Sequence, residues 1–144
     1  MPLEVAQIRR HVQSRLADVK RAAEARRDRV AAAERAYTAF LSNVAIPTFT
    51  TFAQALTAEN HPYRVTTPGT AVRLESERSN RTFVDLHLDT SLPVPAVIAE
   101  VSRQRGSRVA TDEHPIAEGV AIDATTDEHV LEFLLELVAD LVER

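Results

Sequence analysis

Apolar positions in the first third of the chain recur with alternating spacings of four and three residues. This heptad pattern continues over five repeats and is interrupted only at Arg26. No Pro or Gly lies within residues 3–43, where Ala, Arg, Glu and Leu dominate and favour a helix. The pattern therefore predicts one long helix over residues 1–46 with an apolar seam along one side. The seam consists of Val5, Val12, Leu16, Val19, Ala23, Val30, Ala33, Tyr37 and Phe40.

The length of this helix predicts that its seam meets another chain. It would rise about 60 Å, whereas the two other helices that we expect are roughly 16 and 25 Å long. Neither is long enough to cover the seam, so the simplest partner is a second copy related by a two-fold axis. The alternative is a single protruding helix, because several seam residues are only alanines.

A proline marks the corner between the long helix and the next segment. Pro47 ends the first helix and fits the first turn of a second one, in which Phe49 and Phe52 recur at helical spacing. We expect these two rings to pack with Tyr37 and Phe40 in one aromatic cluster of the core.

Beyond residue 60 the pattern changes to the two-residue alternation that is typical of strands. The alternation predicts a mainly antiparallel sheet of four or five strands built from hairpins. The clearest strands are residues 71–77 and 82–89, followed by 96–103 and 108–111, with shorter ones at 63–67 and 120–123. In the first hairpin Val72, Leu74, Val84, Leu86 and Leu88 alternate with charged residues and predict a buried face.

The last segment predicts a helix that begins at Thr125 or Thr126, with Glu128 at the capping-box spacing, and ends near residue 143. Its apolar surface is wide enough to need two neighbours, the sheet and either the long helix or another subunit. Its acidic stripe, a candidate partner surface, consists of Glu132, Glu136, Asp140 and Glu143. The chain is thus expected to be α+β, with an oligomerisation arm at residues 1–46 and a small head at 47–144.

One candidate for a chemical site lies on the strand predicted at residues 82–89. Alternation places Asp85, His87 and Asp89 on one face, where Glu75 of the neighbouring strand joins them. Imidazole and carboxylates are ligands for zinc, manganese or non-haem iron. The alternative is a solvated face whose charges pair with Arg73 and Arg78.

Composition narrows the functional classes. The chain has no cysteine, which excludes disulfides, thiolate nucleophiles and cysteine-ligated metals, and its three glycines lie too far apart for a phosphate-binding loop. Residues 1–41 hold nine Arg and Lys against five Asp and Glu, whereas residues 42–144 hold eight against sixteen. Acidic residues interrupt the basic helix, which disfavours nucleic acid and favours an acidic protein as its partner. We expect a cytoplasmic protein without a membrane segment, because no long apolar run occurs.

These patterns favour a non-catalytic protein–protein interaction or assembly module, homodimeric through its first helix and without a cofactor. No catalytic signature is recognisable in the sequence. The first alternative is a metal-dependent enzyme or metal sensor that uses the Asp-x-His-x-Asp face. The second is a small-ligand domain with a cavity between the sheet and the last helix.

Overall fold

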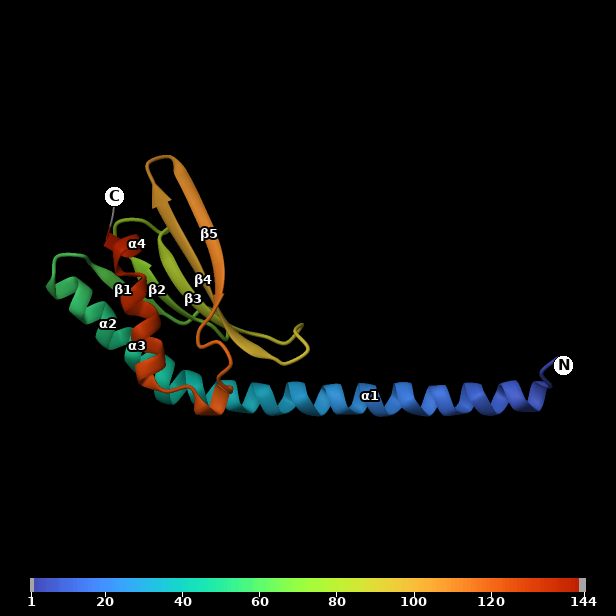
Figure 1. Cartoon of the computed structure of the whole chain (residues 1–144). Helices are drawn as coiled ribbons and strands as arrows, with labels where there is room; N and C mark the ends of the chain where they lie inside the picture. Colours follow the sequence, from blue (N-terminus) through green and yellow to red (C-terminus); the bar gives the residue numbers. More distant parts are fainter. Residues whose placement is uncertain (1, 143–144) are drawn as a thin grey trace.

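A long helix carries a small α+β head at its C-terminal end in the computed structural model, which describes residues 2–142 (Figure 1). Helix α1 (Val5–Phe40) begins after Glu4, whose side chain and that of Gln7 form a reciprocal capping box. The helix continues through one wider π-helical turn, η1 (Leu41–Ala45), into α2 (Ile46–Ala58), so that 54 residues are joined. The predicted long helix and short second helix are confirmed, but Pro47 does not end the first helix, because the three segments are continuous.

The widened turn explains how the chain passes Pro47 without a break. Proline lacks an N–H group and its ring crowds the carbonyl group four residues earlier, which an ordinary α-helix does not accommodate. The π-helical turn directly precedes this proline, and the helix changes direction there (Figure 1). This bend carries α2 away from the line of α1 and allows the head to fold back over the end of α1.

Five antiparallel strands form a meander in the order β1-β2-β3-β4-β5. The turn between β4 and β5 contains only Gly106 and Ser107, and Gly106 has φ +62, a left-handed conformation that glycine adopts most readily. β5 is exposed along its whole length and forms one edge of the sheet. The strands are β1 (Tyr63–Thr66), β2 (Val72–Ser76), β3 (Phe83–Asp89), β4 (Ala96–Arg105) and β5 (Arg108–Pro115).

The C-terminal segment differs from its prediction in three details. Residues 120–123 form no strand, because a 3-10 turn, η2 (Ile122–Ala124), packs Ile122 against the core. Helix α3 (Asp127–Glu136) is capped by Thr126 with His129, rather than Glu128, as the partner in the capping box. It ends at a tight turn and is followed by the short helix α4 (Val138–Val142).

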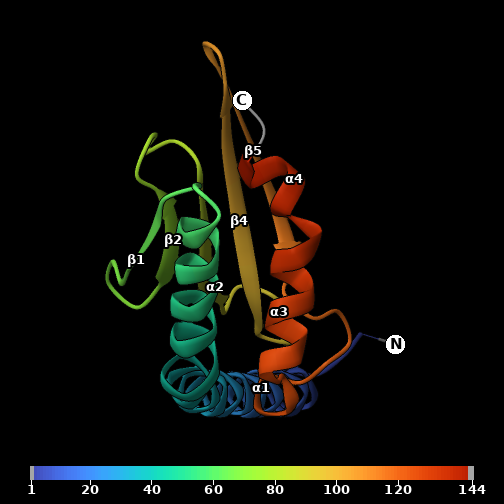
Figure 2. The same ribbon diagram turned by 90° about the vertical axis from the view of Figure 1, so that its left-hand side faces the viewer.

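The core lies between one face of the sheet and the helices α2 and α3, which stand side by side over it (Figure 2). Val72, Leu74, Val84 and Leu86 are fully buried, which confirms the predicted face of the first hairpin, while Leu88 is half-buried. The Oη atom of Tyr63 in β1 donates a hydrogen bond to the Leu141 carbonyl oxygen at 2.6 Å and ties α4 to the sheet. The predicted aromatic cluster is confirmed, since all four of its rings are buried.

Within residues 2–142, none of the helices combines the length and the apolar character that crossing a bilayer requires.

Phe49 is the largest of the fully buried side chains, and its truncation tests the core. We expect Phe49→Ala to lower the free energy of unfolding by about 3–5 kcal/mol, because it removes apolar contacts and leaves a cavity. Gln54→Ala, at an exposed position of the same helix, is the matched control and should change it by less than about 0.5 kcal/mol. Urea denaturation followed by circular dichroism measures both, and equal losses would contradict the packing described above.

Candidate functional site

The first part of α1 forms an arm, residues 5–29, in which every residue is exposed. Along one side of the arm runs an apolar stripe, made of Val5, Ile8, Val12, Leu16 and Val19. Because each residue advances an α-helix by about 100°, these five side chains lie within an arc of about 80°. Val5 is 82% exposed and Leu16 62%, values that are unusual for large apolar side chains on one helical face.

The predicted seam is divided between two environments. Val5, Val12, Leu16, Val19 and Ala23 are exposed in the arm. Further along the seam, however, Val30 and Ala33 are half-buried, and Tyr37 and Phe40 are buried in the core of the same chain. The expectation that nothing in this chain covers the seam is therefore wrong for its C-terminal part, because the bend at η1 folds the head over it.

Tyr37 joins the C-terminal end of α1 to the head. Its Oη atom lies 2.7 Å from the Thr70 carbonyl oxygen and 3.3 Å from the Leu86 carbonyl oxygen, and it donates toward both. Burial, and secondarily the charge of the nearby Asp85 carboxylate, raises the pKa of this hydroxyl to about 12. The residue thus joins the long helix to the sheet through packing and a hydrogen bond at the same point.

The raised pKa makes stability depend on alkaline pH. An unfolded tyrosine titrates near pH 10, so the preference of the fold for the neutral hydroxyl is complete below pH 10 and is lost as pH rises to about 12. We expect the free energy of unfolding to fall over this interval, and to fall less in Tyr37→Phe. That variant should also lose about 1 kcal/mol at pH 7.

Burial also raises the pKa of Tyr63, the second of the two tyrosines, to about 12. Tyr63 therefore accounts for the fall in the free energy of unfolding that remains in Tyr37→Phe between pH 10 and 12. The double variant with Tyr63→Phe should therefore show little loss between pH 10 and 12. Urea titrations at a series of pH values measure this, and an unchanged slope in the double variant would contradict the assignment.

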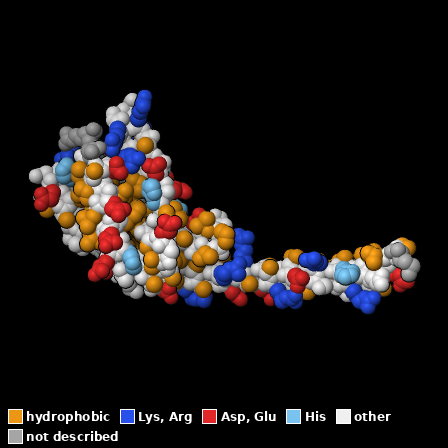
Figure 3. Space-filling view, in the orientation of Figure 1, with side chains coloured by type: hydrophobic (Ala, Val, Ile, Leu, Met, Phe, Trp, Pro, Cys, Tyr) orange, Lys and Arg blue, Asp and Glu red, His pale blue; other side chains and the backbone are white. Residues whose placement is uncertain are grey.

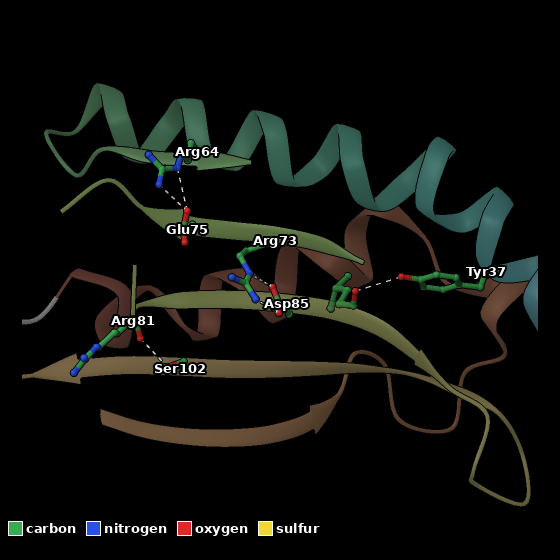
Figure 4. A network of polar contacts seen from close by, with 8 residues as sticks. Tyr37, Arg64, Arg73, Glu75, Arg81, Asp85 and Ser102 are labelled. Carbon is green, nitrogen blue, oxygen red and sulfur yellow. Dashed lines mark hydrogen bonds and ion pairs between the residues drawn. The ribbon is translucent and has the colours of Figure 1, made fainter. Parts of the chain in front are cut away.

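On the outer face of the sheet, away from the helices, two of the four predicted metal ligands, Glu75 and Asp85, bond to arginines (Figure 4). Arg73 donates from Nε and Nη2 to the two oxygens of Asp85, at 2.6 and 2.8 Å, and its guanidinium also lies 4.2 Å from the centre of the Phe83 ring. Arg64 donates two hydrogen bonds to one oxygen of Glu75, at 3.0 and 2.8 Å. Asp85 and Glu75 are both buried, so these pairs neutralise carboxylates that have little access to water.

The rest of the candidate metal set is dispersed along β3. Asp89 accepts hydrogen bonds from the backbone and side chain of Ser91, which hold the pKa of this carboxyl below its ordinary value. His87 is half-buried and pairs across the sheet with Ile98. In the described part of the chain, no three His, Asp or Glu side chains gather closely enough to hold a metal ion.

The acidic stripe of the last helix is only partly free. Glu132 and Glu136 are exposed on α3, but Asp140 on α4 lies 3.0 Å from Arg103 and 3.2 Å from Arg105. Arg103 also pairs with Asp112 of β5, so these contacts hold the C-terminal helix against the end of the last hairpin. Glu143, the fourth member of the stripe, lies outside the described residues.

An open hollow of about 540 Å³ lies between α4 and the nearby ends of the strands, where the sequence predicted a ligand cavity. Several of the polar side chains that line it bond to one another or to the backbone. Ser79 Oγ lies 2.5 Å from the Gln104 side-chain oxygen, and Thr82 accepts a hydrogen bond from the Gln104 backbone. Among its described lining residues, no buried polar side-chain atom lacks a hydrogen-bond partner.

We expect the Arg73–Asp85 pair to contribute measurably to the free energy of unfolding. Asp85→Asn should lower the free energy of unfolding by about 1.5–3 kcal/mol, because it removes charge-assisted hydrogen bonds from a half-buried arginine. The matched control is Asp112→Asn, whose carboxylate is 47% exposed and whose partner Arg103 keeps Asp140. This control should cost less than about 1 kcal/mol, and the reverse order in urea denaturation would refute the interpretation.

No family model matches the chain, and no curated protein or solved structure matches it at a significant level.

Proposed function

We propose that this protein is an interaction module that forms a homodimer through the apolar stripe of its arm and presents its head to a further protein. The observation that supports this is the stripe itself, five exposed large apolar side chains on a helix that touches nothing else along residues 5–25 of the described structure. Most helices in proteins draw their stability mainly from packing an apolar face against a neighbour. A partner that covers the stripe would therefore stabilise the arm.

A second copy satisfies this requirement with the residues already present. Burying a Val, Leu or Ile side chain contributes about 1.5–3 kcal/mol, and a pair of arms would bury two stripes at once. A closed two-fold dimer is the commonest way in which a soluble chain covers such a surface. The exposed, mixed-charge remainder of the arm, including the Asp18–Arg21 ion pair, would stay in water.

The head provides the surface for the further partner. On α3, Leu131 and Leu135 are 42% and 55% exposed, and the acidic residues Glu132 and Glu136 lie beside them. Leu131 also lines a groove of about 380 Å³ between α2 and α3. An apolar patch with an acidic border suits a protein segment that carries apolar and basic side chains.

A charge introduced into the stripe tests the proposed dimer. We expect Leu16→Glu to weaken self-association by about 100-fold or more, because both copies lose a buried leucine and gain a carboxylate at the interface. Ala17→Glu adds the same charge to the same helix but points away from the stripe, so its dimer should remain.

Light scattering over a concentration series gives the mass of each variant. A parent chain that stays monomeric at high concentration, or two variants that weaken equally, would contradict self-association through the stripe.

A further inference from the structure

The head stands on the same side of α1 as the apolar stripe. Eighteen residues make about five turns of an α-helix, so residues eighteen apart point in the same direction. Val12 therefore points as Val30 does, and Val19 points as Tyr37 does. Since Val30 is half-buried and Tyr37 is buried against the head, the stripe points to the side that the head occupies. Figure 3 shows the apolar side chains of the arm along the edge from which the head rises.

The head begins on this side just beyond the stripe. The loop between β3 and β4 lies against the arm, and a shallow groove of about 160 Å³ between them is lined by Arg26, Arg29 and Val30 together with residues 90–93 and Pro95. Beyond this loop, Tyr37 and Phe40 enter the core. A partner helix thus finds the seam free only from Val5 to Ala23, over about 27 Å.

This position of the head restricts how two arms can pair. In a parallel pair, the two seams would face each other along a common axis, and both heads, which lie on the seam side, would occupy the same space. In an antiparallel pair, the heads lie at opposite ends, and each arm covers only the free part of the other. We propose that two chains pair through antiparallel arms around a two-fold axis near Ser14, an inference that rests on the proposed function.

The free seam is self-complementary in this arrangement. Its midpoint is at Ser14, so Leu16 meets Val12 of the partner subunit and Val5 meets Ala23 of the partner subunit, in alternating layers. Val19 meets the aliphatic stem of the partner's Arg9, whose guanidinium reaches solvent. Arg26, which interrupts the heptads, lies beyond this overlap and faces no apolar layer.

The pairing also gives each arm tip a place on the partner's head. When Val5 lies beside Ala23 of the partner subunit, the residues before it reach the level of Arg26 and the β3–β4 loop. Leu3 is 66% exposed at the tip, and Leu92 and Val94 are 38% and 76% exposed in the loop. Contact between them would cover apolar groups that are exposed in the single chain, and it would make a surface from both subunits.

Cysteine cross-linking distinguishes the two directions, because the chain has no cysteine of its own. A disulfide requires Cβ atoms about 3.5–4.5 Å apart, so it reports which positions face each other. We expect a mixture of Val12→Cys and Leu16→Cys chains, one of them tagged, to give mainly the mixed cross-linked dimer on oxidation. Each variant alone should give little. Ser14→Cys, on the opposite side of the helix, is the control and should give none in either direction.

Other results overturn the inference in distinguishable ways. Efficient cross-linking of Val12→Cys or Leu16→Cys to itself would show parallel pairing and leave the proposed dimer intact. A dimer by light scattering that forms no cross-link at either position would show that the arms bind elsewhere, such as on the acidic head of the partner. A monomer would remove the proposed function as well.

Salt dependence provides an independent readout. Each arm carries an excess of basic residues, so antiparallel arms repel one another weakly and the dimer should tighten about twofold to tenfold as salt rises from low to moderate concentration. Docking of a basic arm on an acidic head would weaken over the same range. Weakening with salt would therefore overturn the antiparallel pairing of arms.

Discussion

The apolar side of the first helix is divided between a buried and an exposed environment, and the rest of the architecture depends on this division. Its C-terminal part, with Tyr37 and Phe40, is enclosed by the head and forms part of the core. Its N-terminal part remains exposed over residues 5–23. The same heptad pattern thus contributes to the core of the head and leaves an exposed apolar stripe on the arm, because one continuous helix passes from one environment into the other.

The outer face of the sheet illustrates how a structural role can resemble chemistry. Glu75 and Asp85 lie on the face without helices, yet both are buried, because Arg64 and Arg73 cover them. The Phe83 ring packs against Arg73 and keeps its guanidinium in position. Such cross-strand pairs join β1, β2 and β3 on the side where no apolar core exists. The side chains of this face therefore connect the strands through ion pairs and packing and are not merely solvated.

Local sequence patterns predicted most of the fold but few features of the candidate site. The helix, the strand alternation and the aromatic corner follow from periodicity, because each depends on neighbours a few residues apart. The strand predicted at residues 120–123 was wrong, because two apolar residues two positions apart also fit a short 3-10 turn that packs Ile122 against the core. The partial covering of Val30 and Ala33 by the head was not predictable, because it depends on the direction in which η1 turns the chain. Likewise, alternation placed Asp85 near Arg73 without showing that both carboxylate oxygens are used.

The uninterrupted helix between Val19 and Tyr37 also fixes a rotational phase between the arm and the head. Inserting or deleting one residue in this segment would rotate the stripe by about 100° and turn it away from the side of the head. A change of seven residues would rotate it by only about 20° and would mainly alter the distance between the stripe and the head. The arm can therefore change in length by whole heptads while its stripe stays on the side of the head. Changes of one or two residues would require a compensating change elsewhere in the helix.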